Sequence, residues 1–417
     1  MNNSLLGFKE YEKAGVIYVM ERAAEYGFDY KNRTWLNLGQ GAAEVGHIKG
    51  AIDRVTQIDV DGNQHGYAPV SGLKELRENV ATIYNDLFRK DKHSRYSYEN
   101  VNIAGGGRMV ISRIIASMGK INIGYFVPDY ASYEGILSSF NNVKPMPIFL
   151  DSDSLFKYDH EKLKKEIKQK KLKALILSNP SNPTGNVILG DDLKKLISLA
   201  RREKIYLIVD EFYFNFIYEE KFKLVSATEF VEDTENDFVI VISGLSKAWR
   251  YSGWRVCWAV GPKKIMDLVA NVGSFLDGGA NNPLQKVAIK LVTTKNILKE
   301  SHSIQKHFKA KRDYMLSRLE AMGFVSNSEP GGAFYLWMNI KNLPEGINEG
   351  TKLFEELLKE KVIIVPGKFF DLNPHKRRKK SNFRHHVRFS YGPKMEVLEK
   401  GLDRVEKVVK KFKKAEV

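Results

Sequence analysis

The sequence predicts an α/β fold, in which a mostly parallel sheet of seven strands carries helices on both faces and a smaller α+β domain follows. Between about residues 100 and 260, short apolar runs rich in Val, Ile and Phe alternate with charged, amphipathic stretches. Such runs are typical of strands buried on both faces, and strand–helix alternation builds a parallel sheet between helices. The expected strands are 101–104, 123–127, 146–150, 174–178, 205–209, 238–243 and 256–260.

The alternation ends near residue 295, and we expect three parts in the chain. Residues 48–296 form the large domain. Residues 297–417 form a small domain, which begins with a long basic helix at about 297–322. Residues 1–47 carry apolar side chains at helical spacing among charges, so we expect this segment to pack with the small domain.

Composition restricts the class of protein. The 417 residues are 43% hydrophobic and 28% charged, which indicates a soluble globular protein. The single cysteine, Cys257, excludes an intrachain disulfide. Charged residues such as Lys9 and Glu10 stand where a signal peptide needs an apolar core, and no apolar run reaches the roughly 18–20 residues that span a bilayer. We therefore expect a cytoplasmic protein without a membrane partner.

The net charge of +16 raises the question of a nucleic-acid partner. Lysines are scattered among glutamates along helical stretches, a pattern that favours a solvated surface over a nucleic-acid interface. The one dense cluster is HKRRKK at 375–380, between loop-like sequences. We interpret it as a solvated loop, with an anion-attracting rim beside a site as the alternative.

Polar residues follow five of the expected strands, where ligands bind in open parallel sheets. The segments are 105–108 (GGGR), 128–130 (PDY), 179–185 (NPSNPTG), 210–213 (DEFY) and 244–247 (GLSK). Each segment has a purely structural interpretation beside a functional one. The glycines form either a simple tight turn or an anion cradle at a helix start. Asp210 caps a helix or pairs with a buried cation. Tyr130 is a core residue or a platform for a ring. Lys247, among glycines and aromatics, can lose its proton and act as a nucleophile.

Taken together, these segments resemble the class I/II aminotransferases, the pyridoxal-phosphate family of the aspartate aminotransferase fold. The resemblance covers nearly the whole chain and depends on SNPTG, DEFY, SK and GWR occurring in this order and spacing. It implies that pyridoxal 5'-phosphate binds in the large domain and that an amino group moves between an amino acid and a 2-oxo acid.

The resemblance also implies roles for individual residues. Lys247 is the Schiff-base lysine and proton shuttle, and Asp210 pairs with the pyridine nitrogen, which favours the protonated ring as an electron sink. Tyr213 and Asn182 donate hydrogen bonds to the ring oxygen, and the Asn182–Pro183 peptide is a candidate cis bond. Tyr130 stacks on the ring.

The remaining roles concern the phosphate and the substrate. The resemblance implies that the phosphate is bound by Gly106, Gly107, Arg108, Ser246 and Arg255, with Tyr67 reaching it from the neighbouring subunit of a homodimer. It further implies that Arg388, with Gly41 and Asn182 near by, holds the α-carboxylate of the substrate. No metal ion is expected.

Some positions depart from the family pattern. Arg250, Tyr251 and Cys257 stand where smaller or aliphatic residues are usual, and Gly244 stands where many members carry a phosphate-binding serine. GGGR replaces the more usual Gly-polar-polar-polar sequence. These departures concern the residues expected to bind the phosphate. They do not affect the roles that the resemblance implies for Lys247 and Asp210.

Two alternative functions remain open from the sequence. One is another pyridoxal-phosphate enzyme on the same scaffold: a β-lyase, a cyclising lyase, a decarboxylase or an amino-acid oxidase. The other is a regulatory protein on this scaffold, against which the intact lysine argues. The substrate side chain is also open, because the basic loop favours an acidic substrate, whereas nearby aromatics favour an apolar one: Tyr18, Phe334, Tyr335 and Trp337.

Overall fold

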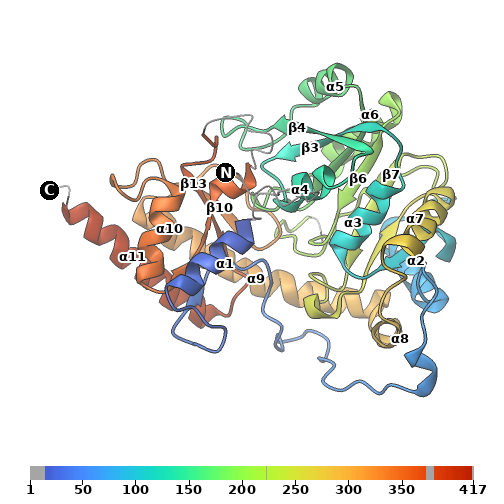
Figure 1. Cartoon of the computed structure of the whole chain (residues 1–417), viewed down its shortest axis with the longest axis horizontal. Helices are drawn as coiled ribbons and strands as arrows, with labels where there is room; N and C mark the ends of the chain where they lie inside the picture. The colour runs from blue at the N-terminus through green and yellow to red at the C-terminus, as the bar shows by residue number, and fades with distance from the viewer. Residues whose placement is uncertain (1–14, 222, 372–379, 416–417) are drawn as a thin grey trace, which may run out of the picture.

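The computed structural model describes residues 15–221, 223–371 and 380–415, so most of the basic cluster at 375–380 lies outside the described residues. The larger half is built around a seven-stranded sheet of order β2-β8-β7-β6-β5-β3-β4 (Figure 1). β8 is antiparallel to both of its neighbours, β2 and β7, and the other neighbouring pairs in this sheet are parallel. The predicted sheet is thereby confirmed. Its strands are β2 (Val101–Ala104), β3 (Ile121–Val127), β4 (Val143–Phe149), β5 (Leu172–Ser178), β6 (Tyr206–Asp210), β7 (Val239–Gly244) and β8 (Cys257–Val260).

The central strands are buried on both faces. Leu175 and Leu177 of β5 belong to one apolar core, whereas Ala174 and Ile176 belong to the other, because successive side chains point to opposite faces of a strand. Both faces are covered by helices (Figure 1). The helices of this half are α2 (Lys74–Phe88), α3 (Gly107–Ala116), α4 (Ser132–Ser138), α5 (His160–Gln169), α6 (Gly190–Glu203), α7 (Lys263–Leu276) and α8 (Asn282–Leu291).

The smaller half holds an antiparallel sheet of order β12-β13-β10-β9. The 29-residue helix α9 (Thr294–Met322) leads from the larger half into the smaller one (Figure 1). The other elements here are β9 (Val325–Ser326), β10 (Tyr335–Asn339), α10 (Gly350–Lys359), β11 (Val362–Ile363), β12 (Val365–Pro366), β13 (His386–Ser390) and α11 (Met395–Ala415). Short 3-10 turns occur at Gly62–His65, Tyr98–Asn100, Ala227–Phe230, Ser252–Trp254 and Gly367–Phe370.

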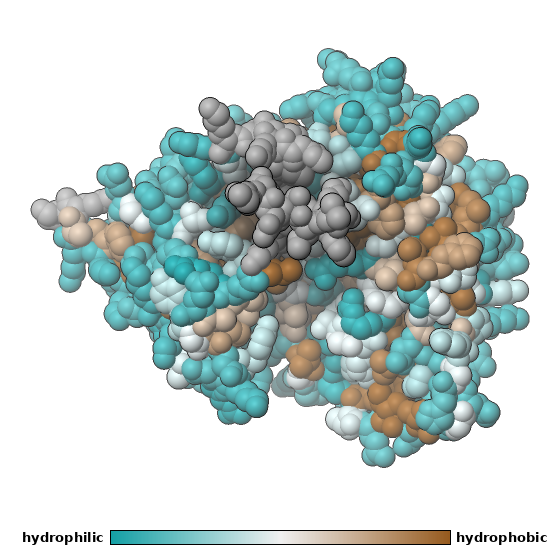
Figure 2. Space-filling view, viewed as in Figure 1, coloured by the Kyte–Doolittle hydropathy of each residue, from teal (hydrophilic) through white to brown (hydrophobic). Residues whose placement is uncertain are grey.

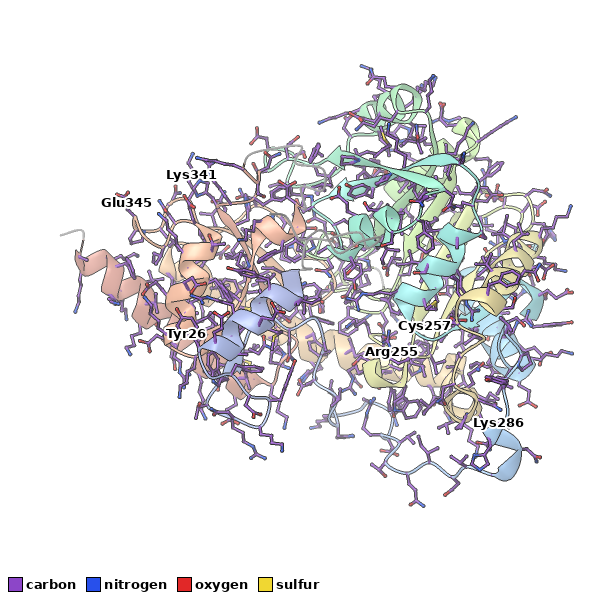
Figure 3. All side chains as sticks on the ribbon, in the orientation of Figure 1. Tyr26, Arg255, Cys257, Lys286, Lys341 and Glu345 are labelled. Atoms are coloured by element: carbon purple, nitrogen blue, oxygen red, sulfur yellow. The ribbon has the colours of Figure 1, made fainter. Side chains whose placement is uncertain are left out.

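The N-terminal segment lies against the smaller half. Helix α1 (Gly15–Glu25) carries Arg22, which pairs with Glu355 of α10 at 2.9 Å, and Tyr26 beyond it bonds the same carboxylate (Figure 3). Strand β1 (Leu36–Asn37) pairs in parallel with β11. The domain boundaries at 47/48 and 296/297 stay predictions. Within the described ranges, no helix is both long and apolar enough to cross a membrane.

Candidate active site

A cavity of about 320 Å³ opens at the carboxyl ends of the parallel strands, where the larger half meets the smaller one. This is within the roughly 300–1,000 Å³ common for small-molecule sites. All predicted site residues line it except Gly106, which lies directly before the lining residue Gly107, and Tyr67. The cavity is lined by Val16, Gly41, Gly107, Arg108, Ile111, Tyr130, Ser178, Asn182, Asp210, Phe212, Tyr213, Ser246, Lys247, Ser252, Arg255, Tyr335 and Arg388.

Asp210 ends the buried strand β6 and faces the cavity. Its carboxylate accepts hydrogen bonds from the Tyr133 hydroxyl at 2.8 Å and from Phe212 N at 3.3 Å. Burial raises the pKa of Asp210 to about 6, although both hydrogen bonds and the charge of Lys247 act in the opposite direction. A buried carboxylate in this position is suited to pair with a cationic group that enters the cavity.

Lys247 lies in the turn after β7, and its Nζ donates a hydrogen bond to the Gly41 carbonyl. Burial lowers the pKa of Lys247 to about 8, and the nearby Arg388 adds to this by charge repulsion, followed by Arg255 and Arg108. A lysine with a lowered pKa carries more of the neutral amine at neutral pH. Lys247 therefore has the chemistry of a nucleophile and a proton carrier.

Arg388 and Asn182 meet on the smaller-half side of the cavity. The Asn182 Oδ1 accepts a hydrogen bond from Arg388 Nη1 at 2.9 Å, and Arg388 Nη2 donates to Gly39 O at 2.7 Å. The Arg388 Nε is buried without a partner among the described residues. The expected cis bond is present at Asn182–Pro183, and the Val127–Pro128 and Asn179–Pro180 bonds are also cis.

Tyr213 is buried, and its hydroxyl lies 2.9 Å from that of Tyr335 on β10. Tyr335 also lies under the Arg388 guanidinium, whose carbon is 4.3 Å from the ring centre. Burial and this neighbouring hydroxyl raise the pKa of Tyr213, so the phenol stays protonated and can donate a hydrogen bond.

The N-terminus of α3 forms an anion cradle. Gly106 has a φ of +107°, and a Cβ at this position would lie 1.9 Å from Arg255 Nη2, so only glycine allows the guanidinium this close. Arg255 Nη1 donates to Ser252 O at 2.8 Å and lies 3.4 Å from Ser246 Oγ. Bare helix N–H groups beside an arginine attract phosphate.

Arg108 lines the cavity and is exposed to solvent. Its guanidinium lies 5.8 Å from the Tyr130 ring centre and 3.4 Å from Ser132 Oγ. Neither contact is strong, so the charge of Arg108 is available to an anion that enters the site.

The departure at Gly244 has a steric cause. Gly244 and Cys257 are directly opposed in the β7–β8 pair, and a Cβ on Gly244 would lie 2.6 Å from the Cys257 Cα and Sγ. A serine does not fit at position 244 in this chain. Ser246 instead lies near Arg255, and Figure 3 shows Arg255 and Cys257 close together at the start of β8.

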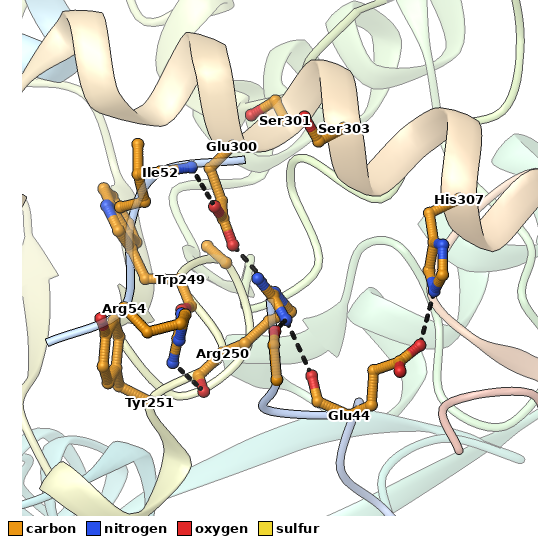
Figure 4. A network of polar contacts seen from close by, with 12 residues as sticks. Glu44, Ile52, Arg54, Trp249, Arg250, Tyr251, Glu300, Ser301, Ser303 and His307 are labelled. Carbon is orange, nitrogen blue, oxygen red and sulfur yellow. Dashed lines mark hydrogen bonds and ion pairs between the residues drawn. The ribbon is translucent and has the colours of Figure 1, made fainter. Parts of the chain in front are cut away.

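Arg250 forms a buried ion pair with Glu300 of α9 at 2.8 Å (Figure 4). Its Nη1 also donates to the carbonyls of Glu44 (3.0 Å) and Gly46 (2.6 Å), so the turn after Lys247 is fixed to the segment that contains Gly41. A second contact joins the same two parts of the chain, because Arg54 donates hydrogen bonds to the carbonyls of Trp249 and Arg250. The unusual Arg250 therefore has a positioning role that its sequence context did not reveal.

Glu44 links the same segment to α9. Burial alone would raise its pKa, but hydrogen bonds from His307 and Lys311 outweigh burial and lower the pKa of Glu44 to about 2 (Figure 4). Lys311 also donates to Pro393 O at 2.6 Å. Lys311 therefore connects the N-terminal segment, through Glu44, with the chain just after β13, through Pro393.

The other predicted residues are placed as follows. Tyr67 is 98% exposed and does not reach the cavity of its own chain. Of the aromatics, Tyr335 lines the cavity, and the Phe334 ring lies 5.9 Å from Lys247 Nζ. Tyr18 packs on Phe369, and Trp337 stacks on His386. Four residues near the cavity were not predicted as functional from the sequence: Ser178, Phe212, Tyr133 and Asp129. For Ser178 and Asp129, the place at a strand end was the available signal.

The comparisons with known proteins agree with this geometry. The model of the family "Aminotransferase class I and II" matches residues 33–405. The aspartate aminotransferase of Sulfurisphaera tokodaii is 27% identical over 385 residues, which cover 90% of each chain. The (5-formylfuran-3-yl)methyl phosphate transaminase of Methanocaldococcus jannaschii is 27% identical over 416 residues, 99% of this chain and 100% of that protein.

A solved structure supports the fold. A double mutant of Thermus thermophilus aspartate aminotransferase matches with a TM-score of 0.77 and 23% identity, covering 98% of this chain and 99% of that one. Because the family model spans nearly the whole chain and the cavity has the expected polar residues, this chain belongs to the class I and II aminotransferases, which use pyridoxal phosphate to transfer amino groups.

Proposed function

We propose that Lys247, Asp210 and Arg388 carry the reaction of this aminotransferase. The observation that supports the proposal most directly is their convergence on one cavity from β7, β6 and β13, respectively. An amine of lowered pKa, a buried carboxylate and a buried guanidinium are the groups that transfer of an amino group requires.

The residues present fit pyridoxal phosphate. The Gly106–Arg255 cradle suits the phosphate, and the buried Asp210 carboxylate suits the ring nitrogen. Arg388 has a buried Nε without a partner in the described part of the chain, which suits the substrate carboxylate. When bound, the cofactor supplies an electron sink for the carbanion formed at the substrate α-carbon.

The remaining steps belong to this chain's own residues. Arg388 fixes the substrate carboxylate, and thereby orients the α-hydrogen toward Lys247. The neutral amine of Lys247 accepts the proton from the substrate α-carbon. It would then deliver this proton to the carbon of the cofactor that receives the amino group. With the cofactor bound, Asp210 would keep a proton on the ring nitrogen, and the hydroxyl of Tyr213 and the amide of Asn182 would donate to the ring oxygen.

A product assay distinguishes this function from the other chemistries of the scaffold. Each amino acid of a panel is incubated with the holoenzyme and 2-oxoglutarate, and the products are identified by mass spectrometry. We expect one 2-oxo acid formed for each glutamate, without release of ammonia or carbon dioxide. Stoichiometric ammonia would indicate a lyase or an oxidase instead, and carbon dioxide a decarboxylase.

We propose an acidic amino acid as a substrate. The S. tokodaii and Thermotoga maritima relatives are named aspartate aminotransferases. If Arg255 serves the phosphate and Arg388 the α-carboxylate, then Arg108 remains as a cation at the rim for a second anionic group.

Arg108→Gln tests the role of Arg108. We expect the KM for aspartate to rise about tenfold, which is about 1.4 kcal/mol, while the KM for alanine changes little. The cofactor Kd is measured in parallel on the apoenzyme. If the cofactor Kd rises and the preference for aspartate is unchanged, Arg108 binds the phosphate, as the sequence predicted.

Arg388→Lys tests the carboxylate assignment. Lysine cannot reproduce the planar two-point contact of guanidinium with carboxylate, so the KM should rise for every amino acid, acidic or apolar. We expect a rise of at least about tenfold, the size of one charge-assisted hydrogen bond. An effect confined to acidic substrates would assign Arg388 to the side chain.

We also propose a homodimer with shared sites. Apolar side chains are exposed on α7 and on the segment that carries Tyr67: Ile58, Val60, Leu268, Phe275 (86% exposed) and Leu276. Figure 2 shows apolar surface over the region where Figure 1 places α7. Exposed apolar surface of this kind is typical of an interface.

Hybrid dimers test the shared site. Lys247→Ala and Tyr67→Ala chains are unfolded together and refolded; in a mixed dimer, one site carries both changes and the other carries neither. With random pairing, activity should approach about a quarter of wild type, well above the parental mean. Hybrid formation is verified by native mass spectrometry. Activity at the parental mean in verified hybrids would place Tyr67 in its own chain's site.

We propose the cytoplasm as the location. The single cysteine, Cys257, is a buried free thiol, which suits a reducing compartment. Cell fractionation tests the location directly.

A further inference from the structure

Asp129 is a buried acid with no assigned role. It lies two residues after the end of β3, between Pro128 and Tyr130, and is 5% exposed. Among the described residues, no cation forms an ion pair with it, and burial raises its pKa to about 7. An unpaired carboxylate is costly to bury, and such groups concentrate at functional sites.

Both oxygens of Asp129 accept hydrogen bonds from residues that line the cavity. Oδ1 accepts from Tyr130 N at 2.6 Å and from the Ser178 hydroxyl, and Oδ2 accepts from Ser178 N at 3.1 Å. β3 and β5 are neighbours in the sheet, so their carboxyl ends bring Asp129 and Ser178 together. The Asp129 carboxyl group accepts at both oxygens, whereas the amide of an asparagine would present a donor at one of these positions.

The contact continues beyond Ser178. The Ser178 Oγ accepts from Asn182 N at 3.1 Å, and Asn182 Oδ1 in turn accepts from Arg388 Nη1 at 2.9 Å. A continuous chain of hydrogen bonds therefore joins Tyr130, Asp129, Ser178, Asn182 and Arg388.

We propose that Asp129 is a positioning residue that fixes Tyr130 and Asn182 relative to each other. Tyr130 then stacks on the face of the cofactor ring, and Asn182 contacts its edge. Asp129 acts through these two residues and touches neither cofactor nor substrate. The proposal rests on the proposed function, in which Tyr130 and Asn182 contact the cofactor.

The test measures the affinity of the apoenzyme for pyridoxal phosphate by quenching of tryptophan fluorescence. Asp129→Asn should raise the cofactor Kd about tenfold, the size expected for losing a hydrogen bond to a charged group. Asn182→Ala should raise it by a similar factor. The double variant should exceed Asn182→Ala by clearly less than about tenfold, because the part of the Asp129 effect that acts through Asn182 is already lost and only the part that acts through Tyr130 remains.

Asp237→Asn is the control for a merely structural effect. Asp237 is a buried carboxylate that accepts from Glu232 N and Arg201, away from the cavity. Its substitution should lower the melting temperature and leave the cofactor Kd unchanged. If Asp129→Asn does not fold, Ser178→Ala removes only the hydroxyl from the chain and should raise the Kd about threefold, without adding to Asn182→Ala.

The outcomes separate this inference from the proposed function. An unchanged Kd for Asp129→Asn beside a raised Kd for Asn182→Ala would overturn the inference alone. Fully additive effects in the double variant, about a hundredfold in total, would also overturn it, because Asp129 would then not act through Asn182 at all. An unchanged Kd for Asn182→Ala would refute the cofactor assignment of Asn182, and the inference with it.

Discussion

The Lys247→Ala protein is expected to bind pyridoxal phosphate and yet to lose turnover by at least about ten-thousand-fold. The proposed phosphate cradle and Asp210 remain in this variant, so the cofactor should still be held. The nucleophile and the proton carrier are both lost, and proton transfer by a placed side chain alone contributes about 10²–10⁴-fold. Single-turnover absorbance of the holoenzyme measures the loss.

Borohydride reduction identifies the lysine independently. In the wild type, the label should map by mass spectrometry to the peptide that contains Lys247. Lys286→Ala, a change at an exposed lysine on α8, is the matched control and should keep both label and activity. Label on any other lysine would refute the assignment of the whole site.

Asp210→Ala should lower turnover by at least about a hundredfold, roughly 2.7 kcal/mol. Without the carboxylate, the ring nitrogen loses the charge that keeps its proton, and with it the electron sink. Asp210→Asn, which keeps the shape and removes the charge, should be similarly impaired. A near-normal rate for Asp210→Asn would show that Asp210 only organises the turn through Phe212 N.

The pH dependence of cofactor binding gives a second measurement on Asp210. Its pKa is raised to about 6, so the carboxylate is ionised above that pH and becomes protonated as the pH falls through it. Cofactor affinity should therefore fall below about pH 6 in the wild type. In Asp210→Asn, this fall should disappear, because the titrating group is gone.

The sheet was predictable because each strand is a short apolar run, and burial on both faces makes such runs continuous rather than alternating. The cavity was predictable because parallel strands bring their carboxyl ends together, so the polar residues after five runs had to converge. The expected positions of Asn182, Asp210, Lys247 and Arg388 at one cavity depended on that geometry and on the family resemblance.

Other features depend on contacts between distant segments and leave no pattern in the sequence. The role proposed for Asp129 depends on Ser178 lying beside it across β3 and β5. The positioning role of Arg250 depends on Glu300 and on the backbone carbonyls of Glu44 and Gly46. The sequence alone shows Gly244 only as a missing phosphate-binding serine. The reason for the glycine is Cys257, which lies opposite and leaves no room for a side chain. The proposed role of Tyr67 depends on a second chain.

The pairing of β1 with β11 has a consequence for the order in which the protein matures during synthesis. Leu38 O accepts from Ser390 N, and Arg388 donates to Gly39 O, so the segment near Gly41 is completed by residues translated more than three hundred positions later. Domains generally fold as units, and the N-terminal ones fold first. On the ribosome, the seven-stranded sheet can therefore form with Lys247 and Asp210 in place, while Arg388, the residue proposed to hold the substrate, has not yet been made. Under the proposed function, a nascent chain is expected to acquire its cofactor site before its substrate site, and to become an enzyme only near the end of translation.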